Sequence, residues 1–139
     1  MPIKYADVDG GIGTVFEARG LLTSDEWASC FREYLSQGNK KLEQYKFNLC
    51  DYSAVTETTV SSSDIRSSAL ISRDSAASMQ DLVYCIIAPQ DLIHGLARVG
   101  IAVGDLPWEI NLVKTRKEAE EWIRAEVKEK FGIEQIQFS

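Results

Sequence analysis

Hydroxyl, carboxyl, imidazole and guanidinium groups gather in two short stretches of the chain, at residues 51–64 and 91–98. Each stretch follows an apolar run with the composition of a buried strand. The carboxyl ends of neighbouring parallel strands lie at one edge of a sheet, where ligands commonly bind. The sequence therefore predicts one polar rim, which we call the predicted rim, made of these residues: Asp51, Ser53, Ser61, Ser62, Ser63, Asp91, His94 and Arg98.

The serine run admits two interpretations. A phosphate on Ser62 or Ser63 would lie at a helix N-terminus, where free backbone N–H groups and the helix dipole favour negative charge. Alternatively, Ser61 or Ser63 caps that helix, and the threonines before it make local hydrogen bonds. The first interpretation predicts a phosphorylation switch, and the second predicts a structural role.

An aspartate, the single histidine and a serine could form a relay of acid, base and nucleophile, as in a hydrolase. The sequence has no Gly-x-Ser-x-Gly elbow, however, and its serines precede a helix without the sharp turn that exposes a nucleophile. These residues favour a protein that is not an enzyme. One histidine and three cysteines on separate apolar segments lack the spacing of a zinc site, so we expect neither a metal nor another cofactor.

Small residues raise the possibility of an apolar ligand. The helix predicted at 63–78 turns mostly small side chains inward, and glycines at 95, 100 and 104 leave room beside the next helix. Pockets for small molecules are commonly apolar, with a few polar groups at the mouth. The same residues also fit close helix packing with no void. Arg98 could hold a carboxylate or phosphate at the rim, or cover the helix surface.

Composition restricts the class of protein. A chain of 139 residues fits a single domain, and a net charge of −6 disfavours nucleic acid as a partner. The longest apolar run, 82–88, is too short to span a bilayer, and the N-terminal stretch is acidic where a secretory signal would be apolar. We therefore expect a cytoplasmic protein with no integral membrane segment and with three buried, reduced cysteines. The sequence does not decide the oligomeric state, and a homodimer is compatible with it.

Hydrophobic periodicity predicts the elements that position the rim. The predicted strands cover residues 2–8, 12–19, 45–51, 82–88 and 109–114. Two predicted helices begin at the capping boxes Thr23-x-x-Glu26 and Thr115-x-x-Glu118, and two more cover 63–78 and 91–103. The order β-β-α-β-α-β-α-β-α predicts an α/β fold flanked by four helices, with a mixed sheet that is parallel at its centre. The first two strands, joined by a DGG turn, should pair antiparallel.

Two segments, IAPQDLIHGLARVGIAV at 87–103 and VKTRKEAEEWI at 113–123, stand out from the rest of the chain. Together with the order of elements, they resemble the SpoIIAA-like family of small, uncharacterised bacterial proteins, which belongs to the STAS and lipid-carrier-like fold class. The resemblance covers nearly the whole chain and implies a SpoIIAA-like (STAS-type) fold.

In the related anti-sigma-factor antagonists, a phosphorylatable serine lies in an Asp-Ser-Ser-Gly turn after the third strand. The resemblance places Ser61, Ser62 and Ser63 near that position, although this chain reads Ser-Ser-Ser-Asp there. The leading hypothesis is therefore a non-enzymatic regulatory or protein-interaction module of STAS type, controlled by phosphorylation, with a working surface at 53–64 and the start of the helix at 91. The alternative is a binder of a lipid-like or other small apolar ligand, and a hydrolase ranks below both.

Overall fold

The computed structural model describes residues 2–104 and 106–139. Its strands form one five-stranded sheet in the order β1-β2-β3-β4-β5. The strands are β1 (Ile3–Val8), β2 (Gly13–Leu22), β3 (Phe47–Thr58), β4 (Val83–Ile87) and β5 (Glu109–Val113). The helices are α1 (Ser24–Leu35), α2 (Asn39–Leu42), α3 (Ser62–Ala76), α4 (Asp91–Gly104) and α5 (Arg116–Phe131).

The sheet is mixed, as predicted. β1 and β2 pair antiparallel, whereas β2 with β3, β3 with β4, and β4 with β5 pair parallel. The order of elements also follows the prediction, with the addition of α2, a helix of four residues that begins just after Gly38. β3 and β4 therefore point the same way, and the segments that follow them leave from the same end of the sheet.

The turn between β1 and β2 depends on backbone angles that glycine adopts freely. Gly10 and Gly11 have φ angles of 69° and 93°, and Asp9 before them has a φ angle of 52°. Glycine has no Cβ to clash in this region, and Asp tolerates it better than most residues. The DGG sequence thus forms the tight reversal that the antiparallel pairing requires.

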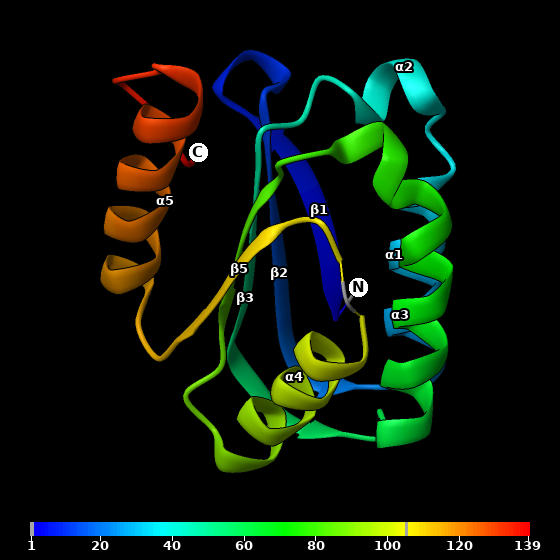
Figure 1. The fold of residues 1–139 in the computed structure, drawn as a ribbon. Helices are drawn as coiled ribbons and strands as arrows, with labels where there is room; N and C mark the ends of the chain where they lie inside the picture. Colours follow the sequence, from blue (N-terminus) through cyan, green and yellow to red (C-terminus); the bar gives the residue numbers. More distant parts are fainter. Residues whose placement is uncertain (1, 105) are drawn as a thin grey trace.

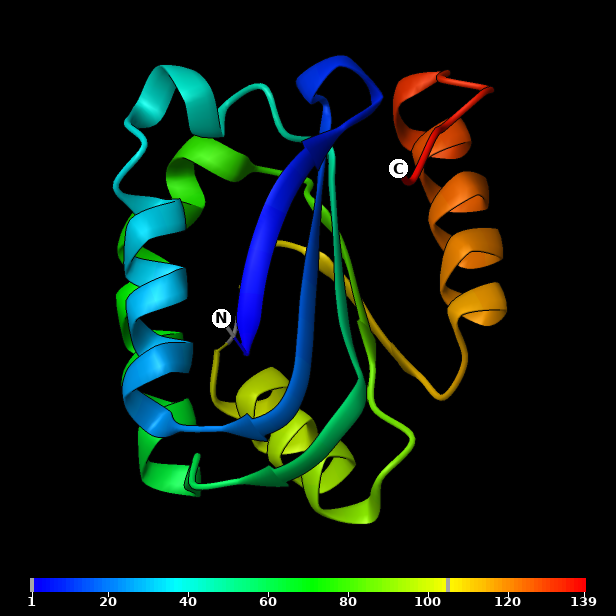
Figure 2. The ribbon, with the colours of Figure 1, turned by 180° about the vertical axis from the view of Figure 1, so that it is seen from behind.

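The helices form two layers on the sheet (Figures 1 and 2). One face is covered by α1, α3 and α4, and the other by α5. Among the described residues, no helix has the length and apolar character that crossing a membrane requires.

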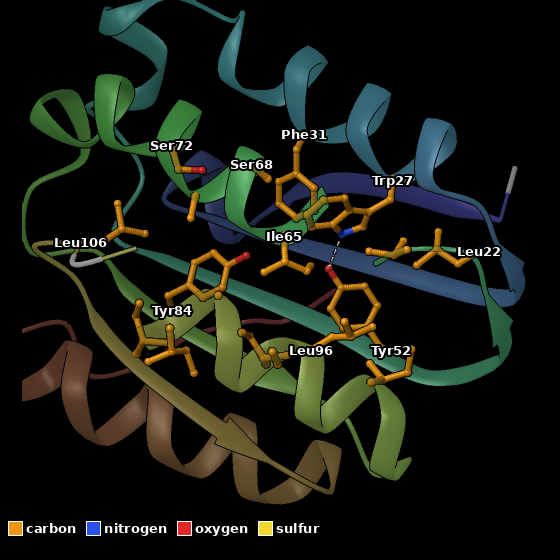
Figure 3. A pocket seen from close by; sticks show the side chains of 18 of the residues that line it. Leu22, Trp27, Phe31, Tyr52, Ile65, Ser68, Ser72, Tyr84, Leu96 and Leu106 are labelled. Atoms are coloured by element: carbon orange, nitrogen blue, oxygen red, sulfur yellow. Dashed lines mark hydrogen bonds between the residues drawn. The ribbon is translucent and has the colours of Figure 1, made fainter. Parts of the chain in front are cut away.

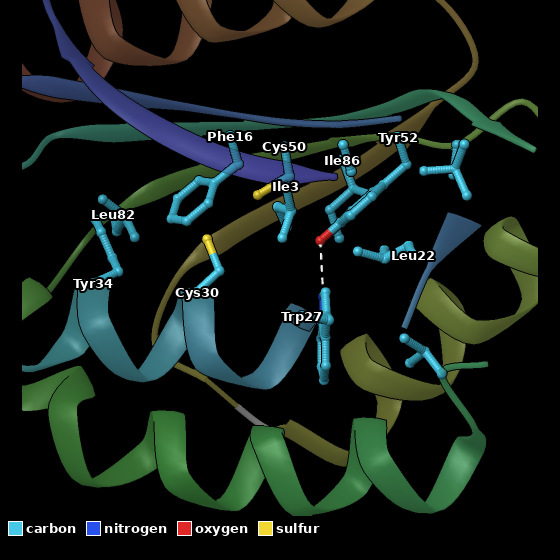
Figure 4. Packing of buried hydrophobic residues seen from close by; sticks show 14 of the residues in the cluster. Ile3, Phe16, Leu22, Trp27, Cys30, Tyr34, Cys50, Tyr52, Leu82 and Ile86 are labelled. Carbon is cyan, nitrogen blue, oxygen red and sulfur yellow. Dashed lines mark hydrogen bonds between the residues drawn. The ribbon is translucent and has the colours of Figure 1, made fainter. Parts of the chain in front are cut away.

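The core beneath α1 is aromatic (Figure 4). Phe16 of β2 stacks on Phe31 of α1 with ring centroids 4.9 Å apart, and Tyr34 meets Phe16 edge-on at the same distance. Cys30 points from α1 toward Phe16 and Cys50. Cys30, Cys50 and Cys85 are all buried and form no disulfide, which confirms the expectation from the sequence.

The core beneath α5 includes a segment for which the sequence predicted no structure. Ala119, Ile123 and Val127 turn inward from α5 as their spacing indicated. After the helix ends, Ile136 and Phe138 are also buried in this cluster, and the ring of Phe138 meets Phe47 edge-on at 5.4 Å. The last residues of the chain therefore complete this face of the core.

β3 is longer than predicted, which corrects the expectation of a loop from residue 53. It pairs with β2 as far as Thr58, through register shifts that absorb extra residues. β4 ends at Ile87, so the last part of β3 has no strand on that side. The Gln90 side chain takes the place of a strand there, because its amide donates to the carbonyl groups of Tyr52, Ser53 and Val55.

Candidate functional site

A cavity of about 130 Å³ lies between the sheet and the helices α1, α3 and α4 (Figure 3). None of the side chains that line it is charged. Five aromatic residues contribute: Trp27, Phe31, Tyr52, Tyr84 and Trp108. Larger aliphatic residues form most of the remaining wall: Leu22, Val60, Ile65, Ile86, Ile93, Leu96, Ile101, Leu106 and Ile110. The other lining residues are small or carry a hydroxyl: Thr58, Ser68, Ala69, Ser72, Ala97 and Gly100.

The floor of the cavity follows from the alternation of side chains along β3 and β4. Alternate residues of a strand point to the same face of a sheet. Cys50 pairs with Ile86, and both belong to the core that faces α1, α3 and α4. Tyr52 lies two residues after Cys50 on β3, and Tyr84 lies two residues before Ile86 on β4. Both side chains therefore point toward the helices.

The roof is formed by α3 and α4, and the residues that α3 turns inward are mostly small, as the sequence predicted. Ser68 and Ser72 of α3 and Ala97 of α4 leave the space beneath them open. At Gly100 the helices approach closely, because a Cβ atom there would lie 3.0 Å from Cγ2 of Ile65. For Ala76 and Gly104, which the sequence grouped with these small residues, the structure describes the helical backbone but not the surroundings.

Four polar groups belong to aromatic residues of the lining: the indole N–H groups of Trp27 and Trp108 and the hydroxyl groups of Tyr52 and Tyr84. The Trp27 indole N–H donates to the Tyr52 hydroxyl at 3.2 Å, and the Cys50 thiol donates to the Tyr84 hydroxyl at 3.2 Å. The ring of Trp108 stacks on that of Tyr84, with centroids 5.5 Å apart. Trp108 Nε1 is buried, and it has no hydrogen-bond partner among the residues that the structure describes.

Burial keeps both tyrosines of the cavity neutral. Loss of hydration raises the pKa of Tyr52 and of Tyr84 well above that of free tyrosine. Their hydroxyl groups therefore remain O–H donors over the whole physiological pH range. The cavity offers an apolar volume with neutral hydrogen-bonding groups and no ionised one.

The predicted rim divides into three groups in the structure. Asp51 points to the face covered by α5, where its carboxylate accepts from the guanidinium of Arg116 at 3.3 Å and from the Ser53 hydroxyl at 2.5 Å. Arg116 also bonds Glu120 at 2.7 Å. Asp51 and Ser53 thus belong to a polar cluster at the start of α5.

The serine run forms the second group, at the start of α3. Ser61 caps the helix: its hydroxyl accepts from the backbone N–H of Asp64 at 3.2 Å, and the Asp64 carboxylate accepts from the backbone N–H of Ser61 at 2.8 Å. Ser24 of α1 adds a hydrogen bond to the same carboxylate at 2.9 Å. Ser62 and Ser63 are exposed. Capping by Ser61, one of the two interpretations of the serine run, is what the structure shows.

The third group lies on α4. His94 is half-buried, and its Nδ1 lies 3.0 Å from the carbonyl oxygen of Ala88. Asp91 and Arg98 are exposed. In the described ranges, no hydrogen bond or ion pair joins His94 to Asp51 or to a serine. That the eight residues act on one ligand stays a prediction.

No group of three or more His, Cys, Asp or Glu side chains in the described part of the chain is placed to hold a metal ion. The cavity described above offers a small organic ligand an apolar site. Sequence reasoning predicted small inward residues on α3 and glycines on α4 but missed Tyr52, Tyr84 and Trp108. The sequence did carry a signal for the two tyrosines. Each lies two positions along its strand from an apolar residue that faces the same core, so its side chain faces that core too.

Comparisons with known proteins bear on the fold. No family model and no curated protein matches the chain. A match exists among solved structures, to the crystal structure of an uncharacterised protein of the DUF3478 family from Shewanella loihica PV-4, described as having a SpoIIAA-like fold. This chain therefore has a SpoIIAA-like fold as well. The two structures superpose with a TM-score of 0.51 over 87% of this chain and 91% of that chain.

The match confirms the fold that the two sequence segments implied. The identity between the two chains is 16%, so the likeness concerns the fold and carries no activity from one protein to the other. Any function has to be argued from the side chains of this chain.

Proposed function

We propose that the protein binds a small apolar molecule in the cavity between the sheet and the helices α1, α3 and α4. The observation that carries this proposal is the lining, which combines five aromatic residues with aliphatic ones and has no charged side chain. Sites for small molecules commonly have such walls, with a few polar groups among them. Of the two main hypotheses from the sequence, the cavity supports the apolar ligand over the regulatory module.

The energetics of packing support the same proposal. Protein interiors are close-packed and hold few voids larger than a water molecule. The atoms that line the cavity lack packing partners on one side, which costs stability. A ligand that fills the space recovers contacts with its walls, and a binding protein tolerates the cost of its empty state for that reason.

Native mass spectrometry of the freshly purified protein tests the proposal. We expect a fraction of the protein to carry the added mass of a small organic molecule, and we expect that mass to disappear in the variant Ala97→Leu, whose larger side chain occupies the cavity. The variant Ala125→Leu, at an exposed position of α5, is the matched control. A ligand-free mass, together with no binding of an added apolar probe, would contradict the proposal.

A regulatory module controlled by phosphorylation is the second proposal, and the exposure of Ser62 and Ser63 in the first turn of α3 favours it. A phosphate there would meet the free N–H groups of the helix N-terminus, and it would also meet the carboxylate of Asp64. The test compares partner capture by Ser62→Asp and Ser62→Ala, read by quantitative mass spectrometry. Identical capture profiles would remove this proposal.

A further inference from the structure

We infer that the ligand of this cavity is an uncharged molecule, about the size of one aromatic ring with a short substituent. It carries an acceptor group that takes a hydrogen bond from the indole N–H of Trp108. The inference rests on the proposed function and adds the chemical class of the ligand. It is drawn from the balance of donors and acceptors in the lining.

Trp108 is the strongest observation. An indole N–H can only donate, and a buried donor without an acceptor is both rare and costly. Trp108 Nε1 is buried, and the residues that the structure describes offer it no acceptor. The stack on Tyr84 holds the ring in place, so the N–H cannot easily turn toward solvent. A ligand oxygen in the cavity would supply what this group lacks.

The tyrosines add donors of the same kind. The oxygen of Tyr52 accepts from Trp27, and the oxygen of Tyr84 accepts from Cys50, so the hydroxyl hydrogen of each is directed elsewhere. Across the described residues, neither hydroxyl donates to a protein acceptor. Both hydroxyl groups point toward the space around Ile65, from opposite sides of it (Figure 3). Among the aromatic residues of the lining, hydrogen-bond donors therefore outnumber the acceptors available to them.

The absence of charge in the lining restricts the ligand further. An ionised carboxylate or ammonium in an apolar enclosure loses its hydration and needs an opposite charge beside it. None of the lining side chains provides one. An uncharged acceptor, such as a ketone, aldehyde or ester carbonyl, satisfies the donors without this cost.

The size of the cavity sets the size of the ligand. Its volume of about 130 Å³ is close to that of an engineered apolar cavity of about 150 Å³ in another protein, which admits benzene. One ring with a short substituent is therefore the scale of molecule that fits. Acetophenone and ethylbenzene form a suitable pair of probes, because they have similar shapes and only acetophenone has an acceptor.

The test is a titration of the ¹⁵N-labelled protein with each probe, read by the indole N–H resonances of its three tryptophans. We expect acetophenone to bind about tenfold more tightly than ethylbenzene, the effect of one net hydrogen bond. We also expect acetophenone, and not ethylbenzene, to shift the Trp108 indole proton downfield. Trp122, which packs against the core on the α5 face, is the internal control and should not move.

Two further arms sharpen the result. In Trp108→Phe, which keeps an aromatic ring but loses the N–H, the preference for acetophenone should fall to about twofold or less, while Tyr5→Phe on β1 should leave it unchanged. Benzoate, the charged analogue, should bind at least about a hundredfold more weakly than acetophenone. Equal affinity for the first two probes with no downfield shift, or tight binding of benzoate, would overturn the inference and leave the proposed function standing. Binding of neither acetophenone nor ethylbenzene would overturn both.

Discussion

The indole ring of Trp108 stacks on the phenol ring of Tyr84, with centroids 5.5 Å apart and an angle of 16° between the ring planes. Tyr84 belongs to β4, and Trp108 directly precedes β5, so the stack joins two neighbouring strands along one wall of the cavity. The same two side chains carry an N–H and an O–H into the lining. This pair of residues therefore contributes both a part of the wall and two of its hydrogen-bonding groups.

The two tyrosines of the cavity should differ in what their hydroxyl groups contribute to stability. Tyr52→Phe removes the acceptor of the buried Trp27 N–H, and an unpaired buried donor costs about 1–3 kcal/mol. Tyr84→Phe removes the partner of a thiol, which is a weak donor, so we expect a loss below about 1 kcal/mol. Urea unfolding measures both free energies. Equal losses in the two variants would contradict this assignment of partners.

The glycines of α4 should respond differently to alanine. Nothing lies within 4 Å of a Cβ atom built on Gly95, so Gly95→Ala should raise the free energy of unfolding by about 0.5–1 kcal/mol through helix propensity. In Gly100→Ala the new methyl group meets Ile65 at 3.0 Å, and the gain should be absent. Thermal unfolding of both variants, and of Gly100→Ala combined with Ile65→Val, tests this. Equal stabilisation by the two alanines would show that α3 and α4 are less closely packed than described.

The cap of α3 should distinguish Ser61 from its neighbours. Ser61→Ala removes a hydrogen bond to the first turn and should lower the free energy of unfolding by about 1 kcal/mol. Ser62→Ala, one residue further along and exposed, is the control and should change little. Denaturant unfolding at neutral pH compares them, and the interpretation of Ser61 as the cap fails if Ser62→Ala costs as much.

The same cap predicts a dependence on pH. Hydrogen bonds from the backbone and the hydroxyl of Ser61, and from the hydroxyl of Ser24, lower the pKa of Asp64 below its ordinary value of 3.8. A carboxylate with a lowered pKa in the folded state stabilises the fold above the pKa of the unfolded chain, and this contribution is lost as the pH falls through the lower, folded value. Asp64→Asn should therefore lose stability at pH 6 and approach the wild type in acid. A difference between the two proteins that stays constant down to about pH 2 would contradict the lowered pKa.

Much of the fold could be predicted from the sequence because its signals are local. Two capping boxes, the DGG turn and the apolar runs that became β3 and β4 determine most elements and their order. The extent of β3 could not be predicted in this way. Its last residues are polar and resemble a loop, and they stay in the sheet because of β2 and the Gln90 side chain, which lie far from them in sequence.

The candidate site was harder to predict for a similar reason. Side chains alternate along β3, and this alternation alone places Asp51 on the face opposite to Cys50 and Tyr52. The sequence prediction grouped Asp51 with the serines because both follow strand ends, and it did not take the alternation into account. The unpaired N–H of Trp108 is a different case. Whether a buried donor finds an acceptor depends on every neighbour in three dimensions, and no spacing in the sequence records it.

The central claim is that the cavity binds a small apolar molecule, and a titration with ethylbenzene tests it most directly. We predict saturable shifts of the backbone resonances around the cavity and of the Trp27 indole, with none at Trp122 on the α5 face. The shifts should vanish in Ala97→Leu and persist in the exposed control Ala125→Leu. No saturable shift in the wild-type protein, or shifts of equal size in Ala97→Leu, would contradict the claim.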